Sequence, residues 1–140
     1  MALPAGAPCP CGRLSGVGPG KAGQPMAYAD CCQPWHSGQP APTPELLMRS
    51  RYSAFVLGLP DYLQATWHAS TRPADLALEP GTRWLGLEVR SHTQTDATHG
   101  EVEFVARSRV AGKGQRLHER SRFVREEGQW LYVDGDMLTP

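Results

Sequence analysis

The sequence has no excess of charge of either sign. Its 140 residues include 14 Lys and Arg against 14 Asp and Glu, so the formal net charge is zero. Nonspecific binding to nucleic acids or to anionic membranes depends on a surplus of basic residues. The balanced composition therefore gives no strong nucleic-acid signal.

Long hydrophobic runs are missing as well. No stretch approaches the roughly 18 to 20 apolar residues that a membrane-spanning helix requires, so we predict no membrane segment. The opening sequence MALPAGAPCP has no Lys or Arg ahead of an apolar stretch, which argues against a secretory signal peptide. We therefore expect a cytoplasmic protein. In that reducing compartment, clustered cysteines bind metal more often than they form disulfides.

Residues 1–42 lack any stretch that suits a long helix or a central strand. They hold seven of the 15 glycines and eight of the 13 prolines, residues that interrupt both kinds of element. All four cysteines also lie here, within CPCG and DCCQPWH. Because the composition changes at Thr43, we divide the chain into a cysteine module, 1–42, and a globular domain, 43–140.

The cysteines predict a zinc site. Zinc favours four thiolate or imidazole ligands in a tetrahedron, and its binding supplies folding free energy that so small a module cannot gain from its own core. Two other interpretations stay open, namely buried thiols without a metal and redox-active thiols. The candidate ligands are Cys9, Cys11, Cys31 and Cys32, with His36 competing for the fourth position.

Residues 43–140 have the pattern of an α+β domain. A helix is predicted from Thr43, a suitable N-cap, to Gly58, and a second short helix follows over 60–68. Helices that precede consecutive hairpin-linked strands predict packing on one face of an antiparallel sheet. The predicted strands, which alternate with a period of two and are separated by turn sequences, are 83–92, 100–110, 115–126 and 129–135.

The first predicted strand has the sequence RWLGLEVRSH. Strict alternation places Leu85, Leu87 and Val89 on one face and Trp84 on the other.

Several motifs resemble those of known families. CPCG followed by Y-x-x-CC resembles the SEC-C metal-binding motif, and LMRSRYSAF, DYLQATWH and HERSRFVREEGQWLYVDG resemble the YchJ family of uncharacterised bacterial proteins. The resemblance implies an NTF2-like cone, in which N-terminal helices pack on a curved antiparallel sheet around a cavity. It also implies that the four cysteines, rather than His36, bind zinc. The loop between the cysteine pairs is longer than usual, and SGVGPGKAGQP is expected to bulge outward.

An enzyme with this fold would need ionisable groups that face the cavity. His68 and Glu119 are the candidates for acid–base catalysis, although a histidine at a helix end more often serves as a cap. Glu119 shares a strand face with apolar residues, so it needs a partner such as Arg49 or Arg51. The side chains expected to line the cavity are Arg49, Arg51, Tyr52, Trp67, His118, Ser121 and Arg122.

The sequence thus favours a protein with a structural zinc module and an NTF2-like domain that binds a small molecule or another protein. One alternative is an isomerase, dehydratase or hydrolase that uses the cavity. Another is a translation or secretion accessory that docks through the zinc module. The resemblance implies no established activity, and an exposed sheet face offers a surface for a homodimer.

Overall fold

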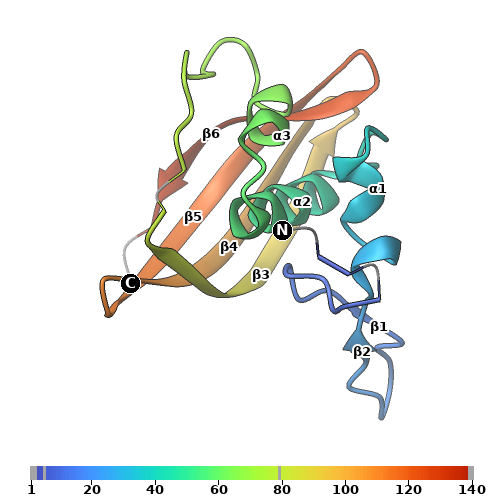
Figure 1. Cartoon of the computed structure of the whole chain (residues 1–140). Coiled ribbons are helices and arrows are strands. Elements are labelled where there is room, and N and C mark those ends of the chain that lie inside the picture. The colour runs from blue at the N-terminus through green and yellow to red at the C-terminus, as the bar shows by residue number, and fades with distance from the viewer. Residues whose placement is uncertain (1–2, 5, 79, 139–140) are drawn as a thin grey trace.

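The computed structural model describes residues 3–4, 6–78 and 80–138. Short N-terminal elements are followed by two helices and a four-stranded antiparallel sheet (Figure 1). No helix in these ranges is both long and apolar enough to cross a membrane. The elements are β1 Leu14–Ser15, β2 Gln24–Pro25, the 3-10 helix η1 Tyr28–Asp30, α1 Gln33–His36, α2 Pro44–Leu57, α3 Pro60–Ala65, β3 Thr82–Asp96, β4 His99–Val110, β5 Lys113–Glu126 and β6 Gln129–Met137.

Helix α2 forms where the sequence predicts a helix, because both ends carry the expected capping residues. The Thr43 hydroxyl accepts a hydrogen bond from the Leu46 N–H at 3.1 Å, and Pro44 occupies the first helical position. Gly58 ends the helix in the left-handed conformation, with φ of 72°. Local sequence is therefore sufficient to set both ends of α2.

The sheet is a meander in which each strand pairs with the next, in the order β3-β4-β5-β6. All three connections are two residues long, and in two of them, Ala111-Gly112 and Glu127-Gly128, both residues have positive φ. Turns of this kind match the twist of the paired strands. The helices lie over one face of the sheet (Figure 1), which confirms the predicted α+β arrangement.

One strand departs from the predicted alternation. The pairing of β3 with β4 shifts register between Trp84 and Gly86, which marks a β-bulge. Trp84 consequently packs against the core together with Leu87 and Val89. Leu85 points away and is 49% exposed. The strict alternation predicted for this strand is therefore wrong at Leu85, because one inserted residue reverses the phase of a period-two pattern.

Helix α2 lies between the cysteine segment and the sheet. One hydrophobic core runs from the four cysteines through Leu47 of α2 to Phe104 and Phe123 of the sheet. The β1–β2 hairpin projects away from this core (Figure 1), and Val17 within it is 65% exposed. The glycine-rich stretch between the cysteine pairs thus extends outward and leaves the buried cysteines undisturbed.

Candidate metal centre and ligand cavity

The first cysteine pair is held in a tight turn. The Gly12 N–H donates to the Cys9 carbonyl at 3.1 Å, and Gly12 has a φ of 75°, which glycine adopts without strain. The Cys9 N–H donates in turn to the carbonyl of Met26, the residue after β2, at 2.8 Å, which ties the turn to the end of the β1–β2 hairpin. The backbone therefore presents Cys9 and Cys11 toward the interior, where both are buried.

The second pair lies where η1 ends and α1 begins. The Cys31 N–H donates to the Tyr28 carbonyl at 3.1 Å, and the Cys32 carbonyl accepts the first helical bond of α1 from the His36 N–H at 3.0 Å. Adjacent side chains in a strand point to opposite faces. At this bend Cys31 has φ and ψ of −117° and −94° and Cys32 is already helical, so both sulfurs reach the same point.

The four cysteines form one compact sulfur cluster. Their Sγ atoms all lie within 4.8 Å of one another, and no cysteine is more than 5% exposed. Sγ of Cys11 lies 3.5 Å from Sγ of Cys31, and all four cysteines are free thiols. A buried, all-sulfur set at these separations has the composition of a metal site.

Crowding of the thiols controls their ionisation. The hydrogen bond from Cys11, followed by those from Cys31 and Cys32, holds the pKa of Cys9 well below its usual range. Hydrogen bonds with Cys31 and Cys32 lower the pKa of Cys11 to about 7. The pKa values of Cys31 and Cys32 rise, mainly because each donates to Cys11. Thiolates so close together require a cation before all four can ionise.

His36 lies beside the cluster and uses both ring nitrogens elsewhere. Its Nε2 lies 2.8 Å from the Ser50 carbonyl, so it must carry the proton and donate. Its Nδ1 then accepts from the Tyr28 hydroxyl at 2.6 Å. Burial lowers the pKa of His36, which favours this neutral form. The geometry therefore makes His36 a link between the cysteine segment and α2, with no nitrogen directed at the sulfurs.

Two further side chains of α2 support the cluster. Ser53 is fully buried and its hydroxyl donates to Sγ of Cys32 at 3.3 Å. Arg49 donates from Nη1 to the Cys11 carbonyl at 3.1 Å and from Nε to Glu45 at 2.8 Å. Arg49 is thus part of the module interface, whereas the sequence analysis expected it in the cavity.

Sequence reasoning missed Ser50 and Ser53 altogether. Both are buried small polar residues of α2, three positions apart and on the same face. A pair of serines at helical spacing inside an apolar helix is the signal that could have indicated a second packed face.

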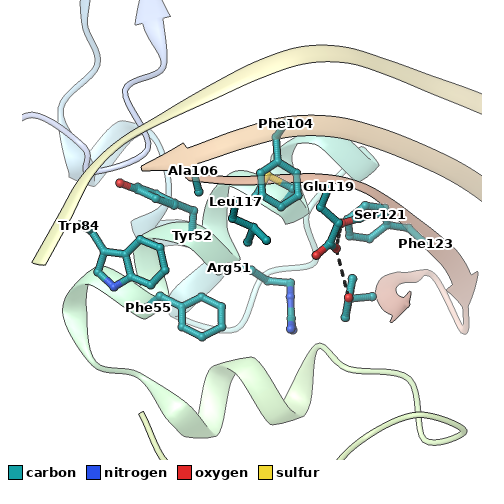
Figure 2. A pocket seen from close by; sticks show the side chains of 12 residues that line it. Arg51, Tyr52, Phe55, Trp84, Phe104, Ala106, Leu117, Glu119, Ser121 and Phe123 are labelled. Carbon is teal, nitrogen blue, oxygen red and sulfur yellow. Dashed lines mark hydrogen bonds between the residues drawn. The ribbon is translucent and has the colours of Figure 1, made fainter. Parts of the chain in front are cut away.

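A cavity of about 320 Å³ lies on the other side of α2, against the inner face of the sheet (Figure 2). Most of its wall is aromatic or aliphatic, and its ionisable side chains are one guanidinium, one carboxyl and the tyrosine hydroxyls. The lining residues are Met48, Arg51, Tyr52, Phe55, Trp84, Phe104, Ala106, Leu117, Glu119, Ser121, Phe123 and Tyr132. Four of the residues proposed from sequence therefore lie here, namely Arg51, Tyr52, Glu119 and Ser121.

Arg51 is only 6% exposed, and neutral groups compensate its charge. Its Nη1 donates to the Leu63 carbonyl at 2.8 Å and to the Thr66 hydroxyl at 2.7 Å. Its guanidinium carbon lies 5.0 Å from the ring centre of Trp67 and 4.8 Å from that of Tyr132, which are cation–π distances. Burial lowers the pKa of Arg51 to about 10, so the side chain stays protonated at neutral pH.

Glu119 is 9% exposed and reaches the cavity from β5 (Figure 2). Its Oε2 accepts hydrogen bonds from the hydroxyls of Ser121 and Tyr132, the latter at 3.2 Å. Burial, together with the neighbouring Glu119, raises the pKa of Tyr132, so this hydroxyl remains a donor. The expected ion pair with Arg51 does not form among the described residues.

Comparison with known proteins places this architecture in a family. Residues 43–135 match the family described as YchJ, middle NTF2-like domain. The chain belongs to the YchJ family. It is 62% identical over 134 residues to a UPF0225 protein of Polaromonas naphthalenivorans (strain CJ2), across 94% of this chain and 98% of the relative. A UPF0225 protein of Cupriavidus metallidurans is 55% identical over 141 residues, across 96% and 92% of the two chains.

Two solved structures resemble this YchJ-family chain along most of its length. A SEC-C motif containing protein from Rhodopseudomonas palustris has a TM-score of 0.75 and 34% identity, and the match covers 84% of this chain and 96% of that one. A second, from Psychrobacter arcticus, has a TM-score of 0.77 and 32% identity, with 97% and 85% covered. The NTF2-like domain and the cysteine cluster thus occur together in a known fold.

The two residues proposed for acid–base catalysis do not meet in this YchJ-family chain. His68 follows α3 and lies outside the cavity wall, where its Nε2 lies 2.8 Å from Oε2 of Glu126 and its Nδ1 lies 2.7 Å from the Ser70 hydroxyl. Trp67 is behind the wall rather than in it, with its ring against Tyr132 at 5.2 Å.

His118 and Arg122 lie on the opposite face of the sheet from the cavity. Nε2 of His118 lies 2.8 Å from Oε2 of Glu103, a neighbour on β4. Arg122 pairs with Asp134 at 2.6 Å and with Asp136 at 2.7 Å, both on β6. Because successive residues of β5 alternate between faces, His118 and Arg122 cannot share the cavity with Glu119.

Proposed function

We propose that this protein binds a small molecule in the cavity of its NTF2-like domain, and that a structural zinc ion holds the cysteine module on the far side of α2. In this proposal the helices and the curved sheet form the walls of a cone. The observation that carries it is the cavity of about 320 Å³ with Arg51 and Glu119 buried in an otherwise apolar wall. Burying ionisable groups is costly, and convergent polar groups in an apolar pocket are typical of ligand sites.

The cysteine cluster supports zinc over other metals. A tetrahedral zinc ion with Zn–S bonds of about 2.3 Å separates its sulfurs by about 3.8 Å, which agrees with Sγ separations that all stay within 4.8 Å. Thiolates are soft ligands that select against magnesium and calcium. Four thiolates leave no open position for a substrate, so the role we assign to the zinc ion is structural.

The cavity favours binding over catalysis. The described residues that line it offer one carboxyl group, one guanidinium and the hydroxyls of Tyr52 and Tyr132, and no histidine. Burial raises the pKa of both tyrosines, which makes them poor proton-transfer groups at neutral pH. An acid–base catalyst works best when its pKa lies near the operating pH, and His68, the histidine proposed for this role, pairs with Glu126 outside the wall. Small-molecule binding requires only the shape and the polar groups that are present.

Metal analysis and a thermal-shift screen test this proposal together. Protein made without added zinc should contain about one zinc ion per chain, and a library of small polar aromatic compounds should include some that raise the unfolding temperature. Hits should lose their effect on Ala106→Leu, which fills the cavity, and keep it on Ala97→Leu, at an exposed turn. Hits that act equally on both variants, with no chemical-shift changes at cavity residues of the unmodified chain, would contradict the proposal.

A further inference from the structure

The cavity wall carries a carboxyl oxygen that accepts no hydrogen bond from a described residue. Both hydroxyl bonds to Glu119 fall on Oε2, and no described residue donates to Oε1. Glu119 is more than nine-tenths buried. Its carboxyl group rests on Gly135 of β6, where any Cβ would collide with it. Oε1 is accessible rather than sealed in the core, so a carboxyl group that is firmly held in the cavity wall leaves one oxygen to which a ligand can donate.

The charges of the wall indicate a ligand without net charge. Arg51 already has two acceptors and two aromatic rings, and the wall holds one guanidinium and one carboxyl group. A cationic ligand would lose its hydration and be repelled by Arg51. An anionic ligand would lose its hydration and be repelled by Glu119. A neutral molecule avoids both costs.

The walls indicate a flat and aromatic ligand. Tyr52 and Phe55 stand against Trp84 with ring centres 5.6 and 5.7 Å apart, and the rings of Phe104 and Phe123 complete the wall near Glu119 (Figure 2). Aromatic side chains pack best on other rings, in offset or edge-to-face arrangements. A volume of about 320 Å³ lies at the small end of ligand sites and suits one or two fused rings.

We propose that the cavity binds a small neutral heteroaromatic molecule that donates one N–H hydrogen bond to Oε1 of Glu119. This inference rests on the proposed function, because it takes the cavity as the binding site. It adds the class of ligand and the atom that recognises it. Indole represents this class in the tests below, and 1-methylindole is the same ring system without the donor.

Titration of the zinc-loaded full chain with matched probes tests the ligand class. Indole should bind about tenfold or more tightly than 1-methylindole, because a hydrogen bond to a charged group is lost. Tryptamine, a cation, and indole-3-acetate, an anion, should bind more weakly than indole. Calorimetry or chemical-shift titration measures all four. Equal binding of indole and 1-methylindole, or tighter binding of either charged probe, would overturn the proposal.

A pair of variants assigns the preference to one carboxyl group. Glu119→Gln should reduce the preference for indole over 1-methylindole to about threefold or less, because a neutral acceptor makes a weaker bond. Glu101→Gln, on the outer face of β4, should leave it unchanged. A preference that survives in Glu119→Gln excludes Glu119 as the acceptor. If other compounds bind in the cavity and none of the indole probes binds, the ligand class is wrong and the proposed function stands. If Ala106→Leu weakens the binding of no ligand, the proposed function fails as well.

Discussion

Replacement of Gly135 by alanine tests how Glu119 is held. The Glu119 carboxyl group occupies the space that a Cβ at position 135 would need, and Gly135 pairs with Ser121 in the sheet. Gly135→Ala should therefore push the carboxyl group away from the hydroxyls of Ser121 and Tyr132. Two hydrogen bonds to a charged group contribute about 3 to 6 kcal/mol at most. Because the side chain can relax into the cavity, we expect a loss of about 2 to 4 kcal/mol in the free energy of unfolding.

Urea unfolding of the zinc-loaded protein measures this loss, and two comparisons identify its cause. Gly114→Ala, on β5 with open space around its Cα, should change the free energy of unfolding by about 0.5 kcal/mol or less. In a Glu119→Ala background, Gly135→Ala should also become nearly neutral, because the group it displaces is gone. An equal cost in both backgrounds would show that the alanine destabilises β6 directly. It would contradict the contact between Gly135 and the Glu119 carboxyl group.

Three further predictions concern the cysteine module and the buried arginine. Cys11→Ser should lose the zinc ion, measured by metal analysis, and lower the unfolding temperature of the whole chain, because the cysteines share one core with α2; retained zinc would contradict this. Burial lowers the pKa of His36, so the unfolded chain takes up a proton more readily than the folded chain, and stability should fall as the pH drops below about 6.5. Urea unfolding at about pH 7 and about pH 5.5 should show a smaller fall for His36→Gln than for the unmodified chain; equal falls would refute this assignment. Arg51→Met should cost about 1.5 to 3 kcal/mol in urea unfolding, because it removes the hydrogen bonds that a buried charged group donates to the Leu63 carbonyl and the Thr66 hydroxyl; a cost below about 1 kcal/mol would contradict this role.

Much of the domain could be predicted from its sequence, because the deciding interactions are local. Thr43 and Gly58 cap α2 within one turn of the helix, and the turns between strands depend on glycine at particular positions. The alternation of apolar residues in β4 and β5 matches their burial for the same reason: the strand period places Phe104 and Phe123 on the inner face.

The candidate site could be predicted only in part. The cysteines were identifiable because thiols in two close pairs have few other uses in a reducing compartment. The roles of Arg49 and His68 could not be identified, because a long side chain can reach several partners. The sequence does not say which of these partners lies near it in the fold. Arg49 reaches the Cys11 carbonyl, 38 positions away, and His68 reaches Glu126, 58 positions away.

The sequence by itself determined helices α2 and α3, the hairpins of the four-stranded sheet and the four cysteines as candidate ligands, because caps, turns and periodicity act over a few residues. The tertiary structure decided which groups share a site. It buried Ser53 under the sulfur cluster, directed both nitrogens of His36 away from it, and left one oxygen of Glu119 free inside an aromatic cavity. These outcomes depend on which distant segments pack against α2 and β5, and packing between distant segments is set by the whole fold rather than by neighbouring residues.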